Sequence, residues 1–170
     1  YLENLRRFVR EAGGGLVVLG GDRSLGLGGY AETALADVLP VDLSGAAPGR
    51  LFRAGRFRPR PTEAGAEHPI LRWSPDPGQN RRVWESLPPL DGLNWSLKVR
   101  PGAVAVAETP EVKNEYGAAP VIALGEYGAG RTMAVMTDSL WRWKMPYAAA
   151  GGEETLYRDF WTRALRWLSH

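Results

Sequence analysis

The sequence predicts a single α/β domain built around a mixed sheet. Three observations support this class: an amphipathic helical pattern leads into a continuous apolar run, a glycine turn joins two further apolar runs, and a helix with a broad apolar face closes the chain. With 170 residues, 44% of them hydrophobic and 24% charged, the chain can bury one core without disulfides or metals. We therefore expect one domain over residues 1–170.

The first elements follow from the order of apolar and glycine residues. Apolar side chains recur at helical spacing over 1–12, and the glycines at 13–15 end that helix. The run Leu16–Leu19 is apolar without alternation, which predicts a strand of a parallel sheet that is covered on both faces. A glycine-rich loop follows, and residues 32–38 suggest a short helix that ends before Pro40.

The middle of the chain is less regular. Residues 51–59 alternate weakly and end in prolines, which favours an edge strand or an extended arm. The segment 44–77 as a whole gives no clear structural prediction. Residues 79–87 then indicate a helix, and 95–99 and 103–107 indicate two strands.

The last third has the strongest signals. The runs 121–124 and 132–136 are apolar and are joined by the glycine turn 126–131, which predicts an antiparallel hairpin. Because the early strand indicates parallel pairing, the sheet should be mixed. Residues 153–168 form a helical pattern whose apolar side is wide enough to dock on that sheet.

The residue inventory excludes several chemistries. The absence of cysteine removes a thiol nucleophile, a disulfide framework, a thiolate zinc site and an iron–sulfur cluster. Of the two histidines, His68 precedes a proline and His170 ends the chain, so neither supports a catalytic triad or a metal cluster. No apolar run approaches the about 20 residues that a membrane span needs. We predict no catalytic residue, no metal and no cofactor.

The candidate site is the crest, defined as the loops that follow the strands 16–19 and 132–136. Ligands of open α/β sheets bind beyond the carboxyl ends of strands. The glycines fit a dinucleotide fingerprint weakly, and the acidic residue that should follow a second strand is missing. Asp22 and Asp138 at the crest could share a proton or hold a cation, and Arg23 or Arg142 could neutralise an anionic ligand. Alternatively, Asp138 braces a loop whose tryptophans, Trp141 and Trp143, cover the core. The candidate ligand-binding residues are Gly21, Asp22, Arg23, Ser24, Gly26, Gly28, Asp138, Ser139, Trp141 and Arg142.

Five arginines lie between Arg50 and Arg60, with phenylalanines interleaved. Cations beside aromatic rings are typical of single-stranded nucleic-acid surfaces, but a charged edge strand explains the pattern equally well. The formal net charge is only +2. We therefore do not predict nucleic acid as the partner.

Several longer motifs resemble one family. They are the opening run Leu5–Gly21, the loop Ser24–Tyr30, His68-Pro69-Ile70, Trp84–Gly92, Tyr127–Arg131, Asp138–Trp143 and Phe160–Leu168. Together they are similar to the glutamine amidotransferase-like domains of large bacterial proteins that often carry a von Willebrand factor A domain and membrane segments. The resemblance implies a flavodoxin-like three-layer sandwich with a mixed, mostly parallel sheet, here lacking its first strands.

The same resemblance implies where the catalytic residues of active amidotransferases would lie in this sequence. Their cysteine nucleophile would lie near Gly21 or Asp22, in a sharp strand-to-helix elbow, and their His and Glu near Asp138 and Ser139. This chain has no cysteine and no histidine at those places, so thiol chemistry on glutamine is not available to these residues.

We therefore expect a non-catalytic module that binds a small molecule or a protein within a larger, membrane-anchored protein of the bacterial cell envelope. The alternatives are an enzyme of non-thiol chemistry that uses Asp22 and Asp138, and an oligomerisation domain. If the first strands are missing, the sheet exposes an edge. Upstream residues, a second copy or other partner chain, or a rearranged sheet should cover it.

Overall fold

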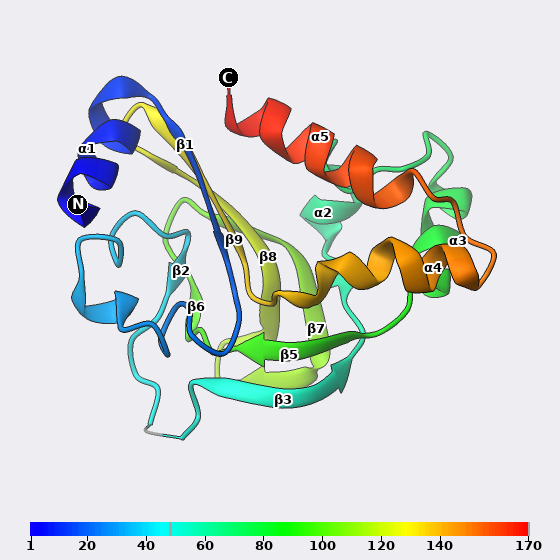
Figure 1. Ribbon diagram of the computed structural model, residues 1–170, viewed down its shortest axis with the longest axis horizontal. Coiled ribbons are helices and arrows are strands. Elements are labelled where there is room, and N and C mark those ends of the chain that lie inside the picture. The colour runs from blue at the N-terminus through cyan, green and yellow to red at the C-terminus, as the bar shows by residue number, and fades with distance from the viewer. Residues whose placement is uncertain (48, 170) are drawn as a thin grey trace.

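A five-stranded sheet forms the centre of the molecule in the computed structural model, which describes residues 1–47 and 49–169 (Figure 1). His170 lies outside the described residues. The innermost pairings are antiparallel, whereas β1 pairs with β9 in parallel. The predicted mixed α/β sheet is confirmed, but the expectation of mostly parallel pairing is wrong for these five strands, because a β-meander supplies most of them. Their order is β1 (Gly15–Leu19), β9 (Gly130–Val135), β8 (Gly117–Tyr127), β7 (Val104–Asn114) and β4 (Arg60–Pro61).

Helices lie on both sides of this sheet, which gives three layers (Figure 1). On one side, α1 packs near β9, and the segment before β2 reaches the sheet at Gly125, where an added Cβ would lie 3.0 Å from the Cβ of Pro40. The opposite side carries the other helices and the aliphatic core. The helices are α1 (Leu2–Ala12), α2 (Glu63–Glu67), α3 (Pro77–Ser86), α4 (Met145–Ala149) and α5 (Leu156–Leu168).

Two small sheets complete the fold. The strand predicted over 51–59 forms and pairs with a strand over 90–94 that the sequence did not indicate. This second strand was missed because Pro88, Pro89 and the Asp91-Gly92 pair are typical of turns. Of the strand predicted over 95–99, only Lys98 and Val99 pair with another strand. The small sheets consist of β2 (Val41–Asp42) with β6 (Lys98–Val99), and β3 (Phe52–Phe57) with β5 (Leu90–Asn94).

The helix expected over 32–38 does not form. The chain instead makes a short 3-10 turn, Tyr30–Glu32, followed by further turns. Thr33 explains the difference, because its hydroxyl donates to the carbonyl of Tyr30 and accepts from the amide of Leu35. Such local side-chain bonds compete with helical ones. A second 3-10 turn, Ser139–Trp143, follows β9.

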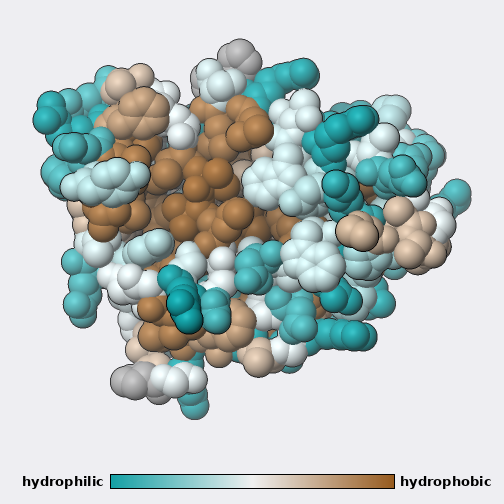
Figure 2. Space-filling view, viewed as in Figure 1, coloured by the Kyte–Doolittle hydropathy of each residue, from teal (hydrophilic) through white to brown (hydrophobic). Residues whose placement is uncertain are grey.

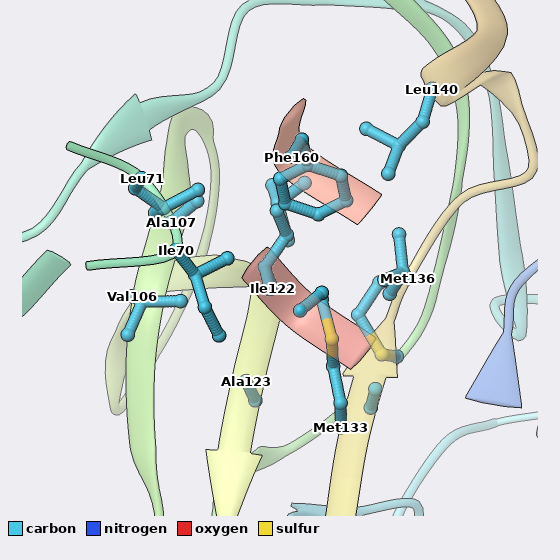
Figure 3. Close-up of a cluster of buried hydrophobic side chains, with 14 of the residues drawn as sticks. Ile70, Leu71, Val106, Ala107, Ile122, Ala123, Met133, Met136, Leu140 and Phe160 are labelled. Carbon is cyan, nitrogen blue, oxygen red and sulfur yellow. The ribbon is translucent and has the colours of Figure 1, made fainter. Parts of the chain in front are cut away.

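The core sits between the sheet and α5 (Figure 3). Met133 and Ile122 from the central strands, Phe160 from α5, and Ile70 and Leu71 from the segment after α2 are completely or almost completely buried there. Next to this cluster, Trp73, Trp84 and Trp143 pack with ring centroids 4.9 to 6.0 Å apart. Their indole N–H groups have no hydrogen-bond acceptor among the described residues, and perpendicular rings allow N–H groups to face aromatic surfaces instead.

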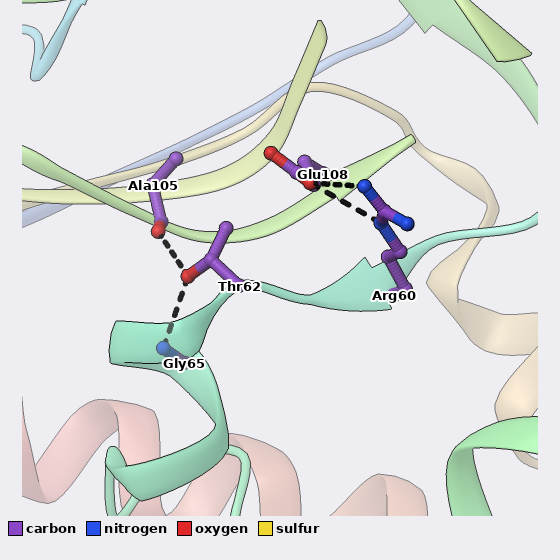
Figure 4. A network of polar contacts seen from close by, with 5 residues as sticks. All are labelled: Arg60, Thr62, Gly65, Ala105 and Glu108. Atoms are coloured by element: carbon purple, nitrogen blue, oxygen red, sulfur yellow. Dashed lines mark hydrogen bonds and ion pairs between the residues drawn. The ribbon is translucent and has the colours of Figure 1, made fainter. Parts of the chain in front are cut away.

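A polar network fastens α2 and β4 to β7 (Figure 4). The hydroxyl of Thr62 accepts from the amide of Gly65, at 3.0 Å, and donates to the carbonyl of Ala105, at 2.6 Å. The guanidinium of Arg60 donates twice to Glu108. An added Cβ at Gly65 would collide with the carbonyl of Val106, so glycine is required where α2 meets β7.

His68 makes the stability of this region depend on pH. Burial lowers the pKa of His68 below its ordinary value. The neutral ring accepts a hydrogen bond from the amide of Ile70 and lies edge-on to Trp167. A histidine with a lowered pKa binds protons more readily in the unfolded chain, so stability is lost as the pH falls through about 6.5 and towards the lower folded pKa.

We predict that the difference in Tm between the wild type and His68→Gln, which does not titrate, shrinks as the pH falls from neutral to about 5. Thermal unfolding of both proteins over this pH range measures it. A difference that stays constant, or grows at low pH, would contradict the prediction.

Candidate functional site at the strand crest

The crest loops meet because β1 and β9 are parallel neighbours whose carboxyl ends lie at the same end of the sheet. The amide of Gly20 continues the pairing by donating to the carbonyl of Val135, at 2.6 Å. Beyond it, an added Cβ at Gly21 would lie 3.4 Å from a carboxylate oxygen of Asp138. The structure thus brings Gly21 and Asp138 together; the sequence suggested that the next residue, Asp22, could approach Asp138.

Asn94, at the end of β5, holds the first crest loop in place. Its side chain is 2% exposed; Oδ1 accepts from the amide of Gly21 at 2.7 Å, and Nδ2 donates to the carbonyls of Gly21 and Ser24 at 2.9 and 3.3 Å. Its own backbone amide donates to the carbonyl of Met136. We call this arrangement the Asn94 clamp. It connects β5, the loop after β1 and the end of β9, and sequence reasoning missed it because these segments are far apart in the chain.

The second crest loop is also bonded internally. The hydroxyl of Ser139 is buried, lies 2.8 Å from the hydroxyl of Thr137, and accepts from the amide of Asp91. The guanidinium of Arg142 donates to the carbonyl of Pro89 at 2.7 Å and lies over the ring of Trp141, which is exposed. Ser139 and Arg142 thus brace the loop against the residues before and within β5.

The other candidate residues, 22–24, 26 and 28, belong to the loop that follows β1. Asp22 and Arg23 are exposed, whereas the hydroxyl of Ser24 donates to the carbonyl of Leu19. At Gly26, an added Cβ would lie 2.9 Å from a methyl carbon of Leu51. At Gly28, it would lie 2.9 Å from the carbonyl oxygen of Arg23. These glycines permit close packing inside the loop.

Leu25, in the same loop, was not among the residues singled out from the sequence. It has a left-handed backbone (φ 54°) and a fully buried side chain. That conformation costs a non-glycine residue about 1 to 2 kcal/mol, which the burial of its side chain offsets.

The crest shows none of the expected catalytic geometry. At Gly21 and Asp22 the chain continues into turns, so no strand-to-helix elbow forms there. Asp138 and Ser139 bring a carboxylate and a hydroxyl; the chain has no thiol, and none of the described crest residues is a histidine. Within the described residues no three His, Cys, Asp or Glu side chains group closely enough to hold a metal ion.

A cleft of about 680 Å³ lies elsewhere, beside β4 at the other end of the strand order, and sequence reasoning missed it. Its walls come from separate segments, so no local motif marks them. The one sequence signal was the arginine run ending at Arg60. None of the crest residues borders this cleft. Its lining consists of Arg58, Pro59, Arg60, Pro61, Ala66, Glu67, Arg72, Ser74, Pro75, Pro77, Asn80, Arg81, Trp84, Glu85, Leu87, Pro110 and Glu111.

The layered α/β fold with a mixed five-stranded sheet is consistent with an amidotransferase-type domain. A family model, GATase1_like, described as "Putative glutamine amidotransferase", matches residues 1–170. The chain belongs to this family. No curated protein matches it.

Two solved structures share the fold. Cytoplasmic Protein STM1381 from Salmonella typhimurium LT2 matches with a TM-score of 0.72 and 25% identity, over 98% of this chain and 60% of that one. Cytoplasmic Protein STM3548 from Salmonella typhimurium matches with a TM-score of 0.68 and 24% identity, over 98% and 59%. The chain thus spans about 60% of the length of these proteins. None of the helices described in this structure is long and apolar enough to cross a bilayer.

We predict that Asn94→Leu destabilises the protein by about 2 to 4 kcal/mol, because the buried amide and carbonyl of Gly21 lose their partners while side-chain volume is kept. The Tm should fall by roughly 5 to 15 °C. Thermal unfolding measures it, with Asn4→Leu on the exposed side of α1 as the matched control. Equal Tm values for the two variants would show that the Asn94 clamp does not hold the crest.

Proposed function

We propose that this domain is a non-catalytic member of its family, a module that binds a small molecule or a protein within a larger polypeptide. The observation that carries the proposal is the internal bonding of the crest. Asn94 engages Gly21 and Ser24, Thr137 and Asp91 engage Ser139, and Arg142 donates to a backbone carbonyl. Polar groups at the reactive end of the sheet therefore support the loops.

The chemistry of glutamine hydrolysis supports the same proposal. That reaction needs a thiolate as nucleophile and a nearby base that activates it. The chain contains no cysteine, and His68 packs against Trp167, beside α2 and α5. Among the described residues, the serine hydroxyls at the crest have no imidazole beside them that could activate a serine in place of the thiol.

The sheet edge supports placement in a larger polypeptide. β1 ends the strand order, so one row of its backbone groups has no strand partner. The expectation that β1 is covered on both faces is wrong, since Leu19 is 44% exposed, Gly15 is also exposed, and the three residues between them are only partly buried. Figure 2 shows an apolar area along β1, between α1 and α5.

We propose that a further strand of the same polypeptide covers this edge. A helix that leads into a parallel strand, as α1 leads into β1, is the second half of a βαβ unit, whose first strand usually lies alongside. The two similar structures are longer than this chain, which leaves room for such a strand in the family's fold. The cell-envelope setting rests on the resemblance alone, and both similar proteins are named as cytoplasmic, so the proposal extends only to a larger polypeptide.

We expect purified protein to release ammonia from glutamine no faster than a protein-free blank. A coupled ammonia assay measures this, with Asp138→Ala as the diagnostic variant. Release above the blank that disappears in Asp138→Ala would overturn the non-catalytic proposal and favour non-thiol chemistry at the crest. Release that survives in Asp138→Ala would overturn it as well, unless it fails to co-purify with the protein.

For the edge, we expect the chain by itself to self-associate with rising concentration, because the apolar β1 edge has no cover. Leu19→Lys should reduce this association, since a charge on the edge disfavours pairing. Val104→Lys is the matched control, because Val104 is 38% exposed but lies on β7. Sedimentation velocity measures the species. A monodisperse wild-type monomer, or equal effects of both variants, would contradict the proposal for the edge.

A further inference from the structure

The cleft beside β4 has the features of a binding site for a small molecule. Its volume of about 680 Å³ falls within the range of sites that hold drug-sized ligands. Five prolines contribute rigid walls, and Trp84, only 6% exposed, contributes apolar surface at the bottom. The ring of Trp84 is fixed by its neighbours Trp73 and Trp143. The shape is therefore held by stiff residues.

One cation of the cleft, Arg81, is free to meet a ligand. Four arginines line it against three glutamates. Only Arg60 forms an ion pair among the described residues, with Glu108, which is not part of the lining. Arg58 and Arg72 donate to backbone carbonyls, and Arg81 has no side-chain partner in the described chain. Arginine stays charged at every physiological pH.

Asn80 adds a hydrogen-bond donor to the lining of the cleft. The residue is 5% exposed, and its Oδ1 accepts from the backbone amide of Trp73 at 2.9 Å. That bond fixes the orientation of the amide, since a backbone N–H requires the oxygen. Nδ2 has no acceptor among the described residues. The residue is buried but its Nδ2 atom is open to the cleft, and the next residue, Arg81, carries the guanidinium that is unpartnered in the described chain, so both can donate to an acceptor oxygen of a ligand.

We propose that this cleft binds a small organic anion, a molecule with a carboxylate or phosphate group on an apolar body. The anionic group accepts hydrogen bonds from Asn80 and from Arg81, which lies one residue further along α3. The apolar body lies against the prolines and Trp84. This site is separate from the crest and from the β1 edge, so it stands whether or not the domain catalyses a reaction.

The test is a titration of the purified protein with phenyl phosphate, phenylacetate and benzyl alcohol, followed by tryptophan fluorescence and by calorimetry. We expect phenyl phosphate or phenylacetate to bind, more weakly at high salt, and the neutral alcohol to bind at least about tenfold more weakly. Whichever anion binds more tightly identifies the natural headgroup as phosphate or carboxylate.

Three variants place the binding in the cleft. Arg81→Gln should weaken it by about tenfold or more, because one charge-assisted hydrogen bond is lost. Asn80→Asp keeps the acceptor for Trp73 but turns the donor into a second negative oxygen, so it should abolish anion binding while the protein stays folded by circular dichroism. Arg82→Gln, at the neighbouring position of α3 but outside the cleft, should change nothing.

The proposal fails if folded wild-type protein binds neither anion at millimolar concentration. It also fails if benzyl alcohol binds as tightly as the anions, since the cleft would then be merely apolar. Equal losses in Arg81→Gln and Arg82→Gln would mean that general surface charge, and not the cleft, attracts the anions. None of these results bears on ammonia release, so this inference and the non-catalytic proposal can fail separately.

Discussion

The Asn94 clamp is the contact on which the arrangement of this domain depends most. One buried residue, Asn94 of the small β3–β5 sheet, bonds the loop after β1 through its side-chain amide and the residue that follows β9 through its backbone N–H. Gly20 must be a glycine for the same reason, since an added Cβ would lie 2.4 Å from Oδ1 of Asn94. The backbone groups of Gly21 are buried, so they need these partners or the loop could not lie against the sheet. Thr137 and Ser139 continue this bonding into the second loop.

Such bonding has a functional meaning. An active site needs polar groups that are left partly unsatisfied and aimed at a substrate, which usually reduces stability. At the crest of this domain, Asn94 and Ser139 bond within the protein and hold the loops, whereas Asp22 and Arg23 are exposed. Under the proposed non-catalytic role, the amidotransferase-type architecture would serve as a scaffold, because the crest loops meet wherever β1 and β9 are parallel neighbours.

Local signals explain how much of this could be predicted. The helix α1, the β8–β9 hairpin and α5 follow from short-range periodicity and from glycine turns, and the meeting of the crest loops follows from parallel strands. What sequence reasoning missed depends on contacts between distant segments. β5 is flanked by turn residues and is extended because β3 pairs with it, and Asn94 bonds a loop 73 residues away. The cleft likewise gathers Arg58, Arg81 and Glu111 from separate segments.

The pairing of β1 with β9 also determines how the chain must fold. These strands lie far apart in the sequence, so residues 20–129 form the loop that their parallel ladder closes. Closing a long loop costs conformational entropy before the β1–β9 contacts can form. The meander from β7 to β9, in contrast, pairs strands that follow one another in the sequence. The meander can therefore act as the template onto which β1 docks late. The strand that carries the crest is then the last to reach its place in the sheet, and its outer edge stays open for whatever joins it.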